Sequence, residues 1–146
     1  LILNRPEEAL LYLDHAGPGS DPAELILAWG MALALSKSPE QGEQILRQVS
    51  AKSARGKFFL GRLLEKQGRI KEALEVYKST VLEHGVFVPA RYRLGMLAME
   101  ANDAATAEIS FTAILHSAHE SDPYYRMAEE KLADLRRRQP RSRRPL

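Results

Sequence analysis

The side chains that could carry chemistry are few, and the histidines come first among them. His116 and His119 lie three residues apart, with Glu120 next to the second, so they could share one face of a helix. Imidazole and carboxylate groups bind zinc, but a zinc site needs further protein ligands, and no other ligand is suitably spaced. The alternative is that these are surface histidines at a helix end. We favour this alternative and predict no metal site and no cofactor.

Motifs for catalysis are missing from the sequence. It contains no phosphate-binding glycine loop, no H-E-x-x-H motif and no Gly-x-Ser-x-Gly turn. The carboxylates are scattered over polar positions, where solvation is their ordinary role, and there is no cysteine for a disulfide or a thiolate metal site. We therefore expect a protein that is not an enzyme and has no catalytic residues.

Basic side chains gather at the C-terminus. From Lys131 onward the chain has seven Lys or Arg residues and one acid, whereas the part before Lys131 has 14 basic and 18 acidic side chains. We expect the tail, residues 136–146, to be disordered or helical only at its start, because it is almost free of apolar residues. Such a tail could bind nucleic acid or anionic lipid weakly and without sequence preference. Its arginines are Arg136, Arg137, Arg138, Arg141, Arg143 and Arg144.

The helices that would position these groups repeat with one fixed offset along the chain. The matched pairs are Gly61 and Gly95, Leu60 and Leu94, Ala73 and Ala107, Tyr77 and Phe111, and Val81 and Leu115. A constant 34-residue offset at five positions of similar size indicates stacked helix-turn-helix units. Small residues let the two helices of a unit approach closely, and the large residue one turn later fills the space between units. Gly68 and Asn102, which have the same offset, predict left-handed residues that end the first helices.

The remainder of the chain fits the same pattern less closely. We expect a half unit at 1–19, units at 20–53, 54–87 and 88–121, a capping helix at 122–135 with a polar outer face, and the basic tail. The chain begins with Leu1 rather than methionine, so we expect a fragment of a longer protein. Its apolar N-terminal half unit could pair with another copy, and simple fraying of the terminus is the alternative.

The repeated residues resemble the tetratricopeptide repeat, whose signature is W-x2-L-G-x2-Y, then A-x3-F, then P. The first clear unit reads Lys57-x2-Leu60-Gly61-x2-Leu64 and then Ala73-x3-Tyr77, and the second reads Arg91-x2-Leu94-Gly95-x2-Ala98 and then Ala107-x3-Phe111. The chain departs from the signature in two places. The tryptophan position holds Lys57 and Arg91, and the proline position holds Gly85 and His119.

This resemblance implies an all-α, right-handed α-α superhelix of about eight antiparallel helices. It also implies a concave groove, lined by the first helix of each unit, that binds a peptide, a helix or a partner domain. The groove positions hold Leu27, Met31, Arg55, Phe58, Arg62, Tyr92, Met96, Met99 and Arg126. The alternative is that the aromatic and methionine side chains among them are ordinary core.

The arginines of this expected groove favour a partner segment that has both apolar and acidic residues. By analogy, bacterial proteins of this kind serve envelope, secretion or exopolysaccharide assemblies, and the chain would then be the soluble part of a larger membrane-associated protein. The longest apolar run, Leu25 to Leu35, is too short to span a bilayer. Binding of nucleic acid or an anionic membrane by the arginine tail is the alternative function.

Overall fold

A computed structural model describes residue 30 and residues 39–50, 53–85 and 87–139. This part of the chain contains six α-helices and no strand. The helices are α3 (Pro39–Ser50), α4 (Ala54–Lys66), α5 (Ile70–Glu83), α6 (Val88–Glu100), α7 (Ala104–Ser117) and α8 (Pro123–Arg138). The all-α expectation is confirmed, whereas the half unit at 1–19 lies outside the described residues. The chain forms two compact units, residues 1–76 and 77–146.

Local sequence explains where the helices begin. Ser53, Asp103 and Asp122 each stand just before a helix, and each side chain accepts a backbone N–H of the first turn, at 3.2, 3.1 and 2.9 Å. Such caps satisfy donors that have no partner inside the helix. Pro123, which has no N–H, occupies the first position of α8, where no intrahelical partner for an N–H exists.

The two predicted turns are confirmed and have the same hydrogen bonds. Gly68 has φ 75° and Asn102 has φ 58°, so both adopt the left-handed conformation. The N–H of Gly68 donates to Glu65 O and the N–H of Arg69 to Leu64 O, both at 2.9 Å. The same two bonds recur in the next repeat, at 3.1 and 2.8 Å, around Asn102. These two bonds satisfy carbonyl groups at the C-terminal ends of α4 and α6. The repeat in sequence is therefore also a repeat in backbone conformation.

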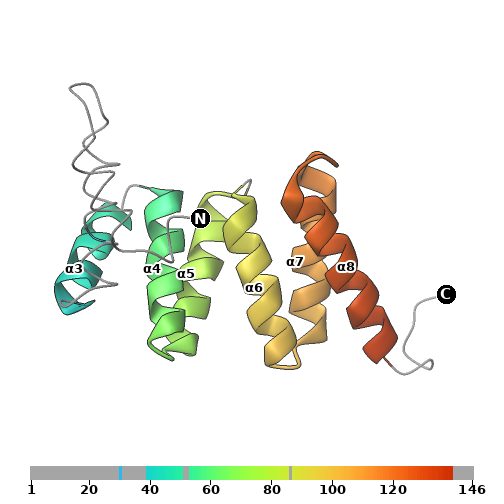
Figure 1. The fold of residues 1–146 in the computed structure, drawn as a ribbon, viewed down its shortest axis with the longest axis horizontal. Helices are drawn as coiled ribbons and strands as arrows, with labels where there is room; N and C mark the ends of the chain where they lie inside the picture. The colour runs from blue at the N-terminus through green and yellow to red at the C-terminus, as the bar shows by residue number, and fades with distance from the viewer. Residues whose placement is uncertain (1–29, 31–38, 51–52, 86, 140–146) are drawn as a thin grey trace. The chain divides into compact units, whose positions relative to one another are not determined.

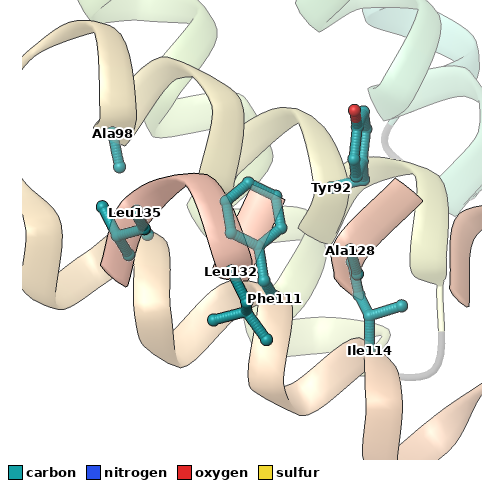
Figure 2. Close-up of a cluster of buried hydrophobic side chains, with 8 residues drawn as sticks. Tyr92, Ala98, Phe111, Ile114, Ala128, Leu132 and Leu135 are labelled. Carbon is teal, nitrogen blue, oxygen red and sulfur yellow. The ribbon is translucent and has the colours of Figure 1, made fainter. Parts of the chain in front are cut away.

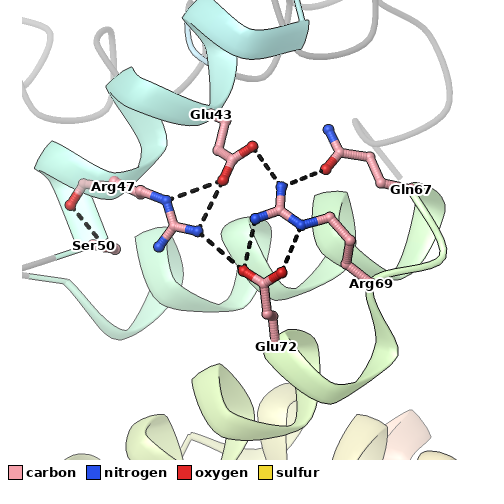
Figure 3. Close-up of polar contacts among 6 residues, drawn as sticks. All are labelled: Glu43, Arg47, Ser50, Gln67, Arg69 and Glu72. Atoms are coloured by element: carbon pink, nitrogen blue, oxygen red, sulfur yellow. Dashed lines mark hydrogen bonds and ion pairs between the residues drawn. The ribbon is translucent and has the colours of Figure 1, made fainter.

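In the first unit, α3 packs against α4 and is also tied to the start of α5. Arg69 lies between two carboxylates, with Nη1 2.8 Å from Glu43 Oε2 and Nη2 2.6 Å from Glu72 Oε2 (Figure 3). Arg47 binds Glu43 at 2.8 Å and approaches Glu72 to 3.6 Å. The four alternating charges form a closed network, which holds α3 more firmly than one isolated exposed pair would.

This network lowers the pKa values of its two carboxylates. The hydrogen bond from Arg69 lowers the pKa of Glu43 below its ordinary value, with a further contribution from Arg47, although partial burial opposes the shift. Arg69 likewise lowers the pKa of Glu72. Each arginine favours the ionised form of the carboxylate that it contacts.

A small residue also marks the close contact of α3 with the preceding segment. Gly30 is helical and buried, and a Cβ at this position would lie 2.9 Å from Ile45 Cγ2 and 3.4 Å from Leu46 Cδ2. Such distances leave no room for a larger residue. Gly30 therefore allows the close approach of its segment to α3.

The second unit is built on α6, α7 and α8, which run in alternating directions and pack side by side (Figure 1). Phe111 is fully buried, and a Cβ on Gly95 would lie only 2.7 Å from its Cε1 atom. The glycine thus makes room for the ring of its own unit. The buried cluster around the ring draws on all three helices and contains Tyr92, Ala98, Ala107, Phe111, Ile114, Ala128, Leu132 and Leu135 (Figure 2).

The two departures from the repeat signature meet at the loop between α5 and α6. Arg91, in the tryptophan position, donates from Nη2 to the carbonyl oxygen of Gly85, in the proline position, at 3.0 Å. The N–H of Phe87 donates to His84 O at 2.9 Å in the same loop. A hydrogen bond from the next helix therefore holds a connection that proline would otherwise stiffen.

The outer face of α8 is polar, as expected of a terminal helix. Arg126, Glu129 and Glu130 are exposed, and Asp134 forms an ion pair with Arg137. The opposite face buries Ala128, Leu132 and Leu135 in the cluster described above. A helix with one apolar and one charged face can end a stack of repeats without exposing a core surface.

Candidate functional site

Three of the expected groove residues lie together on α4. The helix begins after its cap residue, Ser53. Spacings of three and four residues place Arg55, Phe58 and Arg62 on neighbouring turns of one side. Arg55 is exposed, and the other two side chains are half-buried. The opposite side of the helix carries the buried residues, including Leu60 and Leu64. α4 therefore presents aromatic and cationic groups outside its core face.

A fourth residue of this surface, Phe59, was not predicted from the sequence. The Arg55 guanidinium carbon lies 5.9 Å from the centre of the Phe59 ring, and the Phe58 and Phe59 rings are 5.6 Å apart at 57°. A cation at this distance is attracted to the face of the ring. The spacing of four residues between Arg55 and Phe59 is the signal that could have identified the contact. These contacts hold Arg55 and the rings in one cluster.

Arg62 at the end of this cluster already has an acidic neighbour. Its Nη1 atom lies 3.0 Å from Glu65 Oε2, one turn further along α4. Around this pair the helix carries Arg55, Lys57 and Lys66 and no second acid. The α4 surface therefore has an excess of positive charge beside exposed aromatic area.

In the second unit the structure decides between the two interpretations of Tyr92. Its side chain is 7% exposed and belongs to the buried cluster (Figure 2). Its ring lies 5.7 Å from that of Phe111 and 5.4 Å from that of Tyr124. Burial raises the pKa of its hydroxyl. Tyr92 is therefore core, and we no longer place it on an open binding surface.

The other expected groove residues differ in exposure. Met96 and Met99 are partly buried and pack against the same cluster, whereas Arg126 is exposed on α8. Leu27 and Met31 lie outside the described residues. Since methionine adapts to irregular surroundings, this pair on α6 packs against the core while part of each side chain stays exposed.

The basic tail begins inside α8. Arg136, Arg137 and Arg138 form its last turn and are exposed, which confirms a helical start, and Arg137 donates to Asp134. Cations at a helix C-terminus interact favourably with the helix dipole, so these three have a structural role without any ligand. Arg141, Arg143 and Arg144 lie outside the described residues.

The histidines near the end of α7 have separate local partners. His116 Nδ1 lies 2.8 Å from Thr112 O, which can only accept, so this nitrogen carries the proton. His119 Nδ1 instead accepts the N–H of Ser121 at 3.2 Å. The described part of the chain contains no group of three or more His, Cys, Asp or Glu side chains that could hold a metal ion. None of the helices in these described ranges is long and apolar enough to cross a membrane.

The comparison with protein families agrees with this geometry. The tetratricopeptide repeat model matches residues 40–85 and 60–126, which together cover more than half of the chain. The comparison with curated proteins gives no match. Repeats of this family generally mediate protein–protein interactions and are typically not catalytic. The helices form pairs that repeat at a regular spacing, and the family model matches this part of the sequence. The chain therefore belongs to the tetratricopeptide repeat family.

Proposed function

We propose that this protein is a non-catalytic scaffold that binds a partner protein through the outward side chains of its first helices, above all α4. One observation carries the proposal: Arg55, Phe58 and Phe59 form one partly exposed cluster, and Arg62 follows on the next turn of the same side of α4. Aromatic and arginine side chains provide most of the binding energy in protein interfaces. In the second unit, Met96, Met99 and Arg126 are separate candidates for contact with a partner.

The chemistry of this cluster defines the partner that we propose. The rings offer apolar area, and the surplus of positive charge on α4 attracts carboxylates. Arg62 can exchange Glu65 for an acidic residue of the partner, or bind both at once. A helix or an extended segment with apolar and acidic residues satisfies both requirements. A bacterial envelope, secretion or exopolysaccharide assembly is the wider setting that we propose, and it rests on analogy with the family alone.

Peptide selection on the full chain tests this function directly. Immobilised protein is used to select from a random peptide library, and the enriched peptides are titrated against Arg55→Ala, Phe58→Ala and Arg62→Ala. We expect apolar and acidic peptides whose affinity falls about 30-fold in each variant, the usual loss at a strong interface contact. Melting temperatures should stay close to that of the parent, because none of these side chains is fully buried.

Lys71→Ala on α5 is the matched control, since it also removes one exposed positive charge. It should keep the affinity of the parent. Tyr92→Ala should instead lower the melting temperature strongly and affect binding only through unfolding. Peptides that bind all three α4 variants as tightly as the parent would place the binding surface elsewhere.

The alternative function, binding of nucleic acid or anionic lipid, has one supporting observation. Arg136, Arg137 and Arg138 are exposed side by side at the end of α8. No aromatic residue is interleaved with these three cations in α8, whose tyrosines stand at its other end. Any such binding would therefore not depend on sequence.

A further inference from the structure

α7 has apolar residues on more than its core side. Its buried residues, Ala107, Ser110, Phe111 and Ile114, face the interior of the second unit. Ile109 lies outside this face and is 67% exposed. A helix that needed only one covered face would carry polar residues at such a position. The core of the second unit does not account for this isoleucine, so its neighbours on the helix surface decide what it can do.

The residues around Ile109 form a continuous stripe along α7. They line a shallow open hollow of about 550 Å³, which arises because two alanines stand on either side of the isoleucine along the helix. The stripe consists of Ala105, Glu108, Ile109, Thr112, Ala113 and His116. Spacings of three and four residues place all six on one side of the helix. We call this the α7 stripe.

The preceding repeat shows that the fold does not require an apolar stripe. The positions in that repeat that match Ala105, Ile109 and Thr112 hold Lys71, Glu75 and Lys78, and all three are exposed. A helix in the same place in the repeat thus tolerates charge at these positions. The positions that match Glu108 and His116 hold Leu74 and Leu82, so an apolar centre with one polar residue on either side is a feature of α7 and is not shared by α5.

The two polar side chains of the stripe fit a two-fold arrangement. Glu108 and His116 are separated by eight residues, or about 12 Å along the helix axis. In an antiparallel pair of α7 helices centred near Thr112, the Glu108 of each copy lies opposite the His116 of the other. His116 donates its Nδ1–H to Thr112 O, so its Nε2 atom points away from that bond and can donate to a carboxylate once protonated.

The apolar part of the stripe fits the same pairing. A two-fold axis close to Thr112 places Ile109 of one copy near Ala113 of the other, where a methyl group leaves room for it. Small residues on both helices permit the close approach that such packing needs. We propose that the α7 stripe binds the α7 stripe of a second copy, as an antiparallel, self-complementary pair. One helix face buries well below the roughly 800 Å² per partner of a stable interface, so the dimer is weak and reversible.

Sedimentation equilibrium of the full chain tests the pairing. From micromolar to near-millimolar concentration, the average mass should rise from the monomer toward the dimer. Ile109→Lys should weaken self-association at least about 30-fold, because it places a charge in the apolar contact. Leu82→Lys is the control, since Leu82 is 89% exposed on α5 and outside the stripe. A parent protein that stays monomeric, or equal weakening by both variants, overturns the proposal.

Charge exchange tests the orientation of the two helices. Glu108→Arg should weaken the dimer, and the double variant Glu108→Arg with His116→Glu should restore it, because each pair is then rebuilt with reversed sign. His116→Arg should tighten the dimer, since its side chain is always charged. A double variant as weak as Glu108→Arg alone would exclude the antiparallel register.

Cross-linking gives a result that does not depend on affinity. The chain has no cysteine, so Thr112→Cys introduces a single thiol close to the proposed axis. Oxidation should yield a reducible dimer several-fold faster than for Lys78→Cys, the matching position of the preceding repeat on α5. Equal rates for the two variants would show that the stripes do not meet.

Discussion

At the residue scale, glycine and phenylalanine at fixed positions explain the packing of the second unit. Gly95 lies directly against the Phe111 ring, where an added Cβ would stand 2.7 Å from Cε1 and 2.8 Å from Cζ. Phe111 is fully buried, so its ring cannot move aside without disturbing the rest of the cluster. The helix tolerates glycine here because close packing offsets its low helix propensity.

Gly95→Ala tests this balance. Alanine gains about 1 kcal/mol of helix propensity, but overpacking costs about 1–3 kcal/mol, so we expect net destabilisation. Combining it with Phe111→Leu, which frees space beside the new methyl group, should cost less than the two single changes added together. Denaturant unfolding of the four proteins measures the coupling. Strictly additive free energies would mean that the two side chains do not compete for the same space.

At the element scale, hydrogen bonds and ion pairs stabilise helices that would have little stability in isolation. The turns at Gly68 and Asn102 close α4 and α6 with the same two backbone bonds. Glu43 connects α3 to Arg69, just before α5, and its side chain is only 17% exposed. A carboxylate that is held by two arginines stabilises the fold only while it is ionised.

The stability of the first unit should therefore depend on acid pH. Because the folded pKa of Glu43 is lowered, its contribution is complete above the unfolded value near 4.5 and is lost as the pH falls through the folded pKa. Glu43→Gln should cost about 1 kcal/mol at pH 7 and much less at about pH 3. Urea unfolding at both pH values measures this difference. Glu40→Gln, an exposed change on the same helix, is the control for loss of one charge. Parallel pH profiles for the parent and Glu43→Gln would contradict the proposed role.

At the scale of the whole molecule, α8 completes the second unit. Ala128, Leu132 and Leu135 cover the cluster that contains Phe111 and Ile114. Stacked repeats bury their apolar faces only against neighbouring helices, so loss of α8 would expose this cluster. Arg136, Arg137 and Arg138, in the last turn of α8, lie outside this cluster and interact favourably with the helix dipole.

Two truncations separate these roles. Removal of residues 123–146 should lower the melting temperature by more than about 10 °C, because it exposes the apolar cluster. Removal of 139–146 should leave the melting temperature unchanged and reduce only binding to oligonucleotides or anionic vesicles. That binding should weaken with salt, with a log–log slope of about −0.7 to −0.9 per phosphate contacted. Selective binding of one oligonucleotide that survives the shorter truncation would show that a part of the chain other than residues 139–146 recognises nucleic acid.

The sequence alone determined the features that depend on near neighbours in the chain. The repeat period predicted the helical pairs, and Gly68 and Asn102 marked turns that the structure confirms. These signals are readable because turns and caps are made by backbone and side-chain bonds within a few residues.

Only the tertiary structure decided which of several possible faces each helix buries. α6 has apolar residues on most sides, so its sequence could not show that Tyr92 is core while Met96 and Met99 stay half-exposed. The network around Arg69 joins residues 26 positions apart, and no local pattern predicts it. The exposure of Ile109 likewise depends on where α6 and α8 pack against α7, because burial is a property of neighbours in space.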